Sequence, residues 1–343
     1  MLAKKKWLLG STAITAILLV SVFTFVCVAE AKTITLRMAT GAKPVQRFYK
    51  AAEKWMKVVE ERTNGAVEIK AFHSGQLYMY HELADPLIAG DIDLALGTPG
   101  TFGKLAPSSA LDWIGWEVPS EAEGWRAIRE LCEHPDFLAT INGRFQELGV
   151  KLLFYSPLSI IKGPLTVDRP VRTMEDLQGL LVYAPSPSVA DFVKALGGKT
   201  VFVPTGEVYT ALQRGTFQGL LSQQELYFAF KLYEQTKYLT DYIFSAGLMP
   251  FFISMKAWDK LPENVQKVMM DTSREVQAEW FGGQLKFDDF ILSKIKEKLE
   301  IITLTPDEKA RWEKALTASH EKAASINPRT RKVWQLWNEI RSK

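Results

Sequence analysis

The side chains that most often catalyse reactions or hold metals are few in this chain of 343 residues. It contains four histidines, and only His73 and His81 lie near each other in the sequence. Their spacing crosses an expected loop, whereas protein metal sites usually need three or four ligands in a compact pattern. The sequence has no serine-hydrolase, zinc-protease or phosphate-binding loop motif. We therefore expect no catalytic residue, no metal site and no cofactor.

The two cysteines do not indicate redox chemistry. Cys27 lies in the apolar N-terminal segment, and Cys132 lies in an expected helix at 127–133. A lone cysteine on a helix is usually a small buried apolar side chain. A nucleophilic cysteine would need a neighbouring base, and none is evident near Cys132.

The N-terminal segment resembles an export signal. Three lysines at 4–6 precede an apolar stretch at 7–29, and the small residues of Ala29-Glu30-Ala31 are typical of a cleavage site before Lys32. A retained membrane anchor is the alternative, because the apolar stretch is long enough to span a bilayer. Cleavage would lower the net charge from +3 to +1, since three lysines and one glutamate leave. So balanced a surface gives no reason to expect a nucleic-acid partner.

The apolar periodicity predicts two α/β units followed by helices. The elements expected in the first unit are strands at 34–39, 67–72 and 92–96 and helices at 47–63 and 81–89. Those expected in the second unit are strands at 152–154, 180–182, 200–203 and 219–221 and helices at 188–196 and 207–213. Beyond them we expect a long helix over 263–299 and a helical segment over 306–341. This order is typical of two lobes with mostly parallel sheets.

Two such lobes suggest a ligand cleft between them, because ligands of open α/β sheets bind beyond the carboxyl ends of the strands. The segments expected there are 40–43, 73–77, 97–100, 155–163, 183–188 and 222–225. From these segments we select as candidate ligand contacts Gly41, Gln76, Thr98, Pro99 and Pro185.

Residues 168–219 carry the most specific motifs of the chain. They include DRPVRTMEDLQGLLVYAP at 168–185, ALGG at 195–198 and EVYTALQRGTFQG at 207–219. This segment resembles the substrate-binding subunits of tripartite ATP-independent periplasmic (TRAP) transporters, of the dicarboxylate-binding (DctP) type. The resemblance extends to SGQL at 74–77, AGDID at 89–93, KYLT at 237–240 and AWDKLP at 257–262.

The resemblance implies an α/β, two-lobed periplasmic solute-binding fold, with a long C-terminal helix that spans both lobes. The implied parts are a signal peptide at 1–31, mainly the first lobe at 32–155, mainly the second lobe at 156–245, and a crossover strand with C-terminal helices at 246–343. It also implies that the protein captures a small organic acid or a related molecule. The implied partners are the small and large integral membrane subunits of a transporter driven by an ion gradient.

The chain departs from the family at the residue expected to clamp the ligand. The family places an arginine there, which binds a carboxylate through two parallel hydrogen bonds, whereas this chain has Tyr183. A second family arginine corresponds to Lys162, whose alternative is an ordinary solvated lysine. The family asparagine corresponds to Ser222, or to Gln223 if the alignment shifts by one residue.

Two ligand hypotheses follow. In the first, the ligand is still an anion and is bound by Lys162, backbone N–H groups and hydroxyls. In the second, which we favour because a bidentate clamp is missing, the ligand is neutral or aromatic and stacks against Tyr183 with help from Tyr155 or Phe154. Outside the TRAP class, the alternatives are a binding protein for an ATP-driven importer and a ligand sensor that signals to a membrane receptor. An enzyme is the least supported reading.

Overall fold

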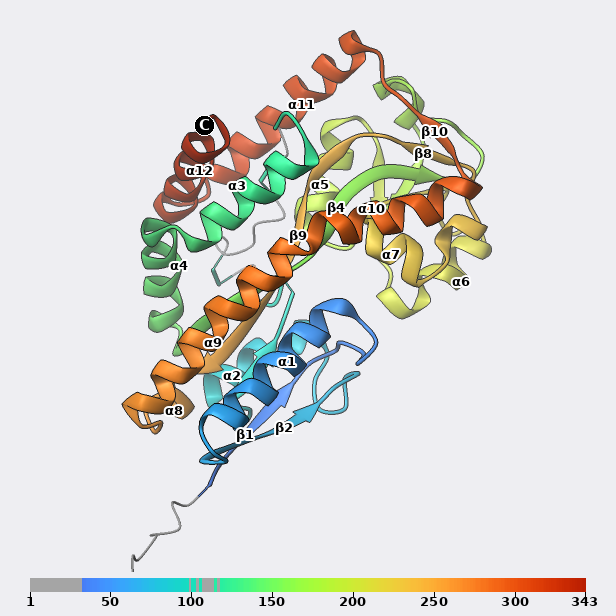
Figure 1. Cartoon of the computed structure of the whole chain (residues 1–343). Helices are drawn as coiled ribbons and strands as arrows, with labels where there is room; N and C mark the ends of the chain where they lie inside the picture. The colour runs from blue at the N-terminus through green and yellow to red at the C-terminus, as the bar shows by residue number, and fades with distance from the viewer. Residues whose placement is uncertain (1–32, 99, 103–104, 107–113, 116–117) are drawn as a thin grey trace, which may run out of the picture. The chain divides into compact units, whose positions relative to one another are not determined.

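The computed structural model describes residues 33–98, 100–102, 105–106, 114–115 and 118–343 (Figure 1). The signal peptide expected at 1–31 and the candidate contact Pro99 lie outside these residues. No helix in the described part of the chain is long and apolar enough to cross a membrane.

The first α/β unit forms one end of the sheet. Strands β1 (Ile34–Ala39), β2 (Val67–Phe72) and β3 (Leu94–Leu96) pair in parallel, with β1 between the other two. Helix α1 (Arg47–Arg62) links β1 to β2, and α2 (Ala84–Ala89) precedes β3. The apolar residues of α1 recur every three or four positions, so one face of the helix is buried against the sheet.

The second α/β unit forms the other end of the sheet. Strand β5 (Leu181–Tyr183) lies between β6 (Lys199–Val201) and β7 (Gly219–Gln223) and is parallel to both. Helices α5 (Pro187–Ala195) and α6 (Val208–Gln213) connect these strands. Both units therefore have the parallel α/β organisation that the sequence predicts.

Two long strands join the units. Strand β4 (Val150–Thr166) and strand β9 (Ile243–Ser254) run antiparallel to each other over nearly their whole lengths. Since β9 also pairs with β3 and β4 with β7, the strand order is β2-β1-β3-β9-β4-β7-β5-β6. The short strands β8 (Tyr238–Thr240) and β10 (Glu300–Ile302) pair with each other, and β8 also pairs with β4.

The continuity of β4 corrects one expectation. We expected 155–163 to be a loop at the end of a short strand, and this is wrong, because the whole segment belongs to β4. Its pairing with β9 shifts in register between Pro157 and Ser159. Proline has no N–H to donate and is tolerated in a strand at such an irregularity.

Helices cover the sheet and link its two ends (Figure 1). Those not yet named are α3 (Glu121–Glu133), α4 (Pro135–Glu147), α7 (Gln224–Ala229), α8 (Met255–Trp258), α9 (Glu263–Gly282), α10 (Gln284–Ile295), α11 (Pro306–Ala324) and α12 (Pro328–Arg341). The helix expected over 263–299 is the pair α9 and α10, joined at Gly283. Because α9 packs on α1 and α10 packs on α7, this pair contacts both units, as the sequence predicts.

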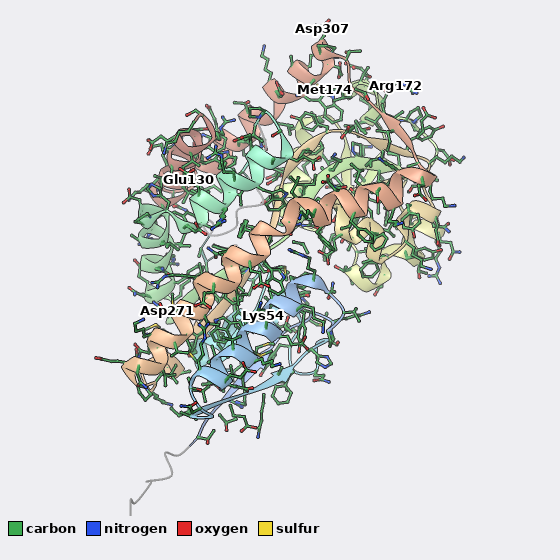
Figure 2. The ribbon with its side chains drawn as sticks, in the orientation of Figure 1. Lys54, Glu130, Arg172, Met174, Asp271 and Asp307 are labelled. Carbon is green, nitrogen blue, oxygen red and sulfur yellow. The ribbon has the colours of Figure 1, made fainter. Side chains whose placement is uncertain are left out.

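A buried tryptophan holds α9 against the first unit. The indole of Trp55 on α1 packs on Phe154 and Phe251, and its Nε1 donates a hydrogen bond of 2.9 Å to Ser273 Oγ on α9. At the edge of this contact Lys54, labelled in Figure 2, pairs with Glu279 at 2.5 Å. The indole is fully buried, so it contributes more to this helix contact than the exposed ion pair.

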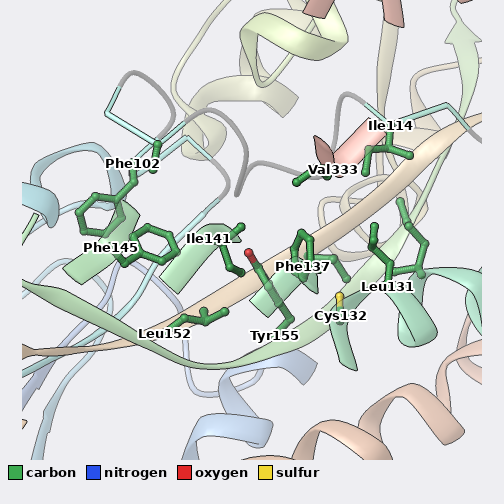
Figure 3. Close-up of a cluster of buried hydrophobic side chains, with 14 of the residues drawn as sticks. Phe102, Ile114, Leu131, Cys132, Phe137, Ile141, Phe145, Leu152, Tyr155 and Val333 are labelled. Atoms are coloured by element: carbon green, nitrogen blue, oxygen red, sulfur yellow. The ribbon is translucent and has the colours of Figure 1, made fainter. Parts of the chain in front are cut away.

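A second apolar cluster packs α3 and α4 against β4. Figure 3 shows Leu131, Cys132, Phe137 and Ile141 gathered around the ring of Tyr155. Cys132 is buried, as expected, and burial raises the pKa of its thiol well above the usual value. A protonated, buried thiol is a poor nucleophile.

Candidate ligand-binding site

Three of the predicted ligand contacts lie together on β4 and β7. Lys162 of β4 is paired with Ser222 of β7, and Ile161 is paired with Gln223. The Ser222 hydroxyl donates a hydrogen bond of 2.9 Å to Gln223 Oε1. The Gln223 side chain also lies against Gly247 of β9, where a Cβ atom would be 2.9 Å from Gln223 Cγ. The absence of a side chain at position 247 thus allows Gln223 to reach the crossing of the two long strands.

The ammonium group of Lys162 is already paired with two carboxylates. Its Nζ lies 2.9 Å from Glu121 Oε1 and 2.8 Å from Asp241 Oδ1, and the residue is only 2% exposed. Burial alone would lower the pKa of Lys162, but the two carboxylates outweigh it and raise the pKa. A ligand anion at Lys162 would therefore have to compete with two carboxylates of the protein itself.

A buried tyrosine that the sequence analysis did not select connects these strands. The Tyr227 hydroxyl on α7 donates to Lys162 O at 2.9 Å and accepts from Ser222 N at 2.8 Å. The Tyr227 side chain is fully buried, so water could not replace its hydroxyl as the hydrogen-bond partner of these two main-chain groups. Tyr227 thus fixes the spacing of β4 and β7 beside Lys162.

We expect Tyr227→Phe to destabilise the protein by about 2 kcal/mol, because the change leaves buried main-chain groups without a partner. Urea unfolding of the native and variant proteins would measure the loss. Tyr209→Phe is the matched control, since its hydroxyl accepts from Gln235 Nε2 at 3.0 Å at a half-buried position. Equal effects of the two substitutions would contradict the role assigned to Tyr227.

The two candidate tyrosines lie in different clusters. The Tyr183 ring is fully buried and stacks on Phe217, with ring centroids 5.7 Å apart. Burial raises the pKa of Tyr183, and a contact with the Thr205 side chain partly opposes that shift. Tyr155 is buried in the cluster shown in Figure 3, and burial raises its pKa well above the usual value. The structure therefore does not bring these two rings together, and their roles in ligand binding stay predictions.

The candidates of the first unit follow its strands. Gly41 lies against the ring of Tyr80, where a Cβ atom would be 3.0 Å from two ring carbons. Thr98 N donates to Thr101 Oγ1 at 2.9 Å, and Thr101 Oγ1 donates to Tyr80 O at 3.1 Å. Gly41 thus contacts the ring of Tyr80, and Thr98 is connected to the Tyr80 main chain through Thr101. Gln76 is exposed.

Pro185 follows the candidate Tyr183 at the end of β5. It lines an open surface hollow of about 270 Å³ between the start of α5 and β6. That hollow is lined mainly by apolar atoms, and the exposed ring of Phe202 forms part of its edge. A role for Pro185 in binding also stays a prediction.

A polar cluster that the sequence analysis did not assemble lies beside β4. We call it the Arg47–Glu225 cluster; its members are Arg47, Ser159, Glu225, Gln284 and Asp288. They come from α1, β4, α7 and α10, so the cluster touches both α/β units and a strand that crosses between them.

Arg47, the first residue of α1, is held by main-chain and side-chain acceptors. Its Nη1 donates to Gln284 Oε1 at 2.5 Å, and its Nη2 donates to Trp280 O at 2.8 Å. The guanidinium also lies 4.9 Å from the centroid of the Phe287 ring. Burial lowers the pKa of Arg47, and the carboxyl groups of Glu225 and Asp288 oppose that shift. The side chain is therefore a fixed cation facing two acids.

Those two acids are buried and differ in their partners. Asp288 Oδ2 accepts from Trp125 Nε1 at 2.8 Å, and Asp288 Oδ1 accepts from Gln284 Nε2 at 3.2 Å. Burial nevertheless raises the pKa of Asp288 to about 7. Glu225 is 8% exposed, its backbone N donates to Ser159 Oγ at 3.2 Å, and burial raises its pKa to about 8.

Glu225 falls within the 222–225 segment that the sequence places at the cleft, but nothing in the sequence marks it as buried. No group of three or more histidines, cysteines and acids able to hold a metal occurs among the residues that the structure describes.

The fold and the cluster together define a class of protein. Two parallel α/β units, joined by crossing strands and by helices that contact both, with polar side chains gathered beside the crossing, form the architecture of a two-lobed solute-binding protein. The chain belongs to the bacterial extracellular solute-binding protein family 7 (DctP), whose family model matches residues 38–326.

Two named relatives are similar to this chain in sequence, and one solved structure has a similar fold. The chain is 24% identical over 323 residues to the C4-dicarboxylate-binding periplasmic protein DctP of Rhodobacter capsulatus, covering 92% of each chain. It is 24% identical to the ectoine/5-hydroxyectoine-binding periplasmic protein UehA of Ruegeria pomeroyi, covering 84% of each. The fold matches DctP7 of Bordetella pertussis, an extracytoplasmic solute receptor that binds pyroglutamic acid, with a TM-score of 0.79 at 17% identity, over 91% of this chain and 100% of that one.

Proposed function

We propose that this chain is the extracytoplasmic solute-binding subunit of a TRAP transporter. It captures a small organic acid or a related small molecule between its two lobes and delivers it to a small and a large integral membrane subunit. The observation that carries the proposal is the family match over residues 38–326, which includes both crossing strands and both α/β units except the first residues of β1. The relatives whose names state a solute support a small polar ligand.

The mechanism is binding and release without a chemical change. A ligand that touches both lobes gains its full set of contacts only when they are closed, so it increases the closed population. We retain 32–155, 156–245 and 246–343 as the main parts of the first lobe, the second lobe and the shared C-terminal region. Strands β4 and β9, together with α9 and α10, are the connections about which the lobes would move.

The protein would work in the periplasm after removal of residues 1–31. The signal-like N-terminus and the family description support this location. Intact-mass measurement of protein exported by a bacterial host tests it, because cleavage before Lys32 gives one definite mass. A mass that includes the apolar segment would favour a retained anchor.

The central experiment is to identify the solute that the protein carries. Mass spectrometry of small molecules released from the purified protein, followed by X-ray scattering with and without the recovered compound, should show one bound solute and a smaller radius of gyration when it is present. Recovery of a chemically altered compound after incubation would point to an enzyme instead. A gene for an ATPase next to the gene of this protein would favour the binding protein of an ATP-driven importer. A neighbouring gene for a receptor kinase would favour the ligand sensor.

The ligand class depends on what replaces the missing arginine clamp. Tyr183 stands at the clamp position, and Lys162 is paired with Glu121 and Asp241. Neither residue supplies a free cation for a dicarboxylate. This pairing disfavours a simple dicarboxylate as the solute. The second ligand hypothesis, in which a neutral or aromatic solute stacks against Tyr183, stays a prediction, because the Tyr183 ring is buried against Phe217.

A further inference from the structure

The first turn of α7 carries buried polar atoms without hydrogen-bond partners. Gln224 is 0% exposed, and neither its Nε2 nor its Oε1 has a partner; the same holds for Oε2 of the neighbouring Glu225. Buried polar atoms are nearly always hydrogen-bonded, because an unpaired one is destabilising. Three such atoms on two adjacent residues indicate a place where something other than the protein supplies the partners.

The surroundings of Glu225 show which kind of partner is missing. Its carboxyl group lies at the N-terminus of α1, where the Arg47 backbone amide donates to it and the guanidinium lies nearby. A helix N-terminus beside an arginine is a favourable place for a negative charge. Here that place is already taken by a carboxyl group of the protein, so it is not available to a carboxylate of the solute.

The other titratable groups around Glu225 disfavour an added anion. Asp288 on α10 raises the pKa of Glu225, and Glu121 on α3 raises that of Asp288. Tyr80, on the short helix Tyr80–Glu82, also faces Glu225. Arg47 is the one positively charged group that acts on Glu225, and it acts on Asp288 as well. Among the residues described, two acids thus share one cation, and a solute that brings an N–H or cationic group would favour the ionised form of Glu225, whose Oε2 then accepts a hydrogen bond.

We propose that Glu225 determines ligand specificity, and that its Oε2 accepts a hydrogen bond from an N–H or cationic group of the bound solute. The inference rests on the proposed function and narrows it to solutes such as amides, lactams and amidinium or ammonium compounds. Gln224, the adjacent residue with two unpaired atoms, is a second candidate for contact with the same solute. Because both residues are buried, the solute reaches them only when the elements that cover α7 move away from it.

A direct test compares two sets of small acids that differ in N–H groups. The first set is ectoine, L-glutamine and L-pyroglutamate, and the second is succinate, glutarate and 2-oxoglutarate. Isothermal titration at pH 7.5 should show at least one member of the first set binding at least tenfold more tightly than every member of the second. In Glu225→Gln the affinity for a cationic or zwitterionic member should fall at least tenfold, while Glu234→Gln, an exposed change on the short helix Leu232–Glu234, leaves it unaltered.

The outcomes separate this inference from the proposed function. Tighter binding of succinate, no binding of any donor-bearing compound, or unchanged affinity in Glu225→Gln would overturn the role of Glu225. In the first and third cases the protein would remain a solute-binding protein. The proposed function itself fails only if the protein binds no compound of either set and carries no solute through purification.

A pH series provides a second readout. Since a cationic donor favours the ionised form of Glu225, its binding should release a proton, and its affinity should rise with pH up to about 8, the pKa of the free carboxyl. Affinity that is independent of pH between 6 and 8.5 would contradict contact with Glu225.

Discussion

The free energy of unfolding of Lys162→Met is expected to be about 3 kcal/mol lower than that of the native protein, because the substitution leaves two facing carboxylates without their shared cation. Glu121 and Asp241 both lie within 3 Å of the ammonium group. The value is at the lower end of the range for breaking a buried ion pair, since the Asp241 side chain is 48% exposed and keeps part of its hydration. Urea unfolding at pH 7 measures the difference.

Lys237→Met is the matched control for this substitution. Lys237 Nζ lies 2.8 Å from Asp168 Oδ1, the same separation as in the Lys162–Asp241 pair, but both partners are exposed. Its replacement should leave stability almost unchanged, because water and salt screen an exposed ion pair. If Lys162→Met were as stable as the native protein and lost only ligand affinity, Lys162 would be a ligand contact rather than part of a structural ion pair.

The elements that the sequence predicts best are those whose local signals agree with their final environment. The helix expected at 207–213 is α6 (Val208–Gln213), and Val208 and Leu212 are buried as its apolar periodicity indicates. The strands expected at 34–39 and 67–72 are found with the same bounds. In each case alternation or helical spacing of apolar residues reports directly which side faces the core.

The long strand β4 could not be predicted in the same way. Its sequence contains Pro157, Gly163 and Pro164, which are typical of turns. The strand persists because β9 and β7 pair with it on opposite sides, and these partners lie far away in the sequence. The prediction of a loop at 155–163 was therefore wrong, because in this strand tertiary pairing outweighs local propensity.

The same limit applies to the Arg47–Glu225 cluster. A glutamate in the first turn of a helix is normally an exposed residue that favours the helix N-terminus. Glu225 is buried because α10 packs against α7 and Arg47 of α1 lies beside its carboxyl group, and both helices are distant in sequence. Lys162 precedes a Gly-Pro pair and likewise has the sequence context of a solvated lysine, but Glu121 and Asp241 enclose it.

Glu225→Gln is expected to stabilise the protein at alkaline pH and to leave it nearly unchanged at pH 5. Burial raises the pKa of Glu225 from 4.5 to about 8. The folded protein therefore holds this proton to a higher pH than the unfolded chain does, and the folded state loses stability as pH rises from about 4.5 to about 8. The shift corresponds to roughly 5 kcal/mol, which the glutamine variant should regain at pH 8.5.

Urea unfolding of the native protein, Glu225→Gln and Glu234→Gln at pH 5, 6.5 and 8.5 measures this effect. Asp288, whose pKa is raised to about 7, adds a loss of the same sign, but it is present in all three proteins and largely cancels in their differences. A difference between Glu225→Gln and the native protein that does not grow with pH would mean that the carboxyl group is solvated. If it does grow, the native protein retains a destabilising acid at the junction of both units, and a solute that donates a hydrogen bond to Oε2 would offset this cost when it binds.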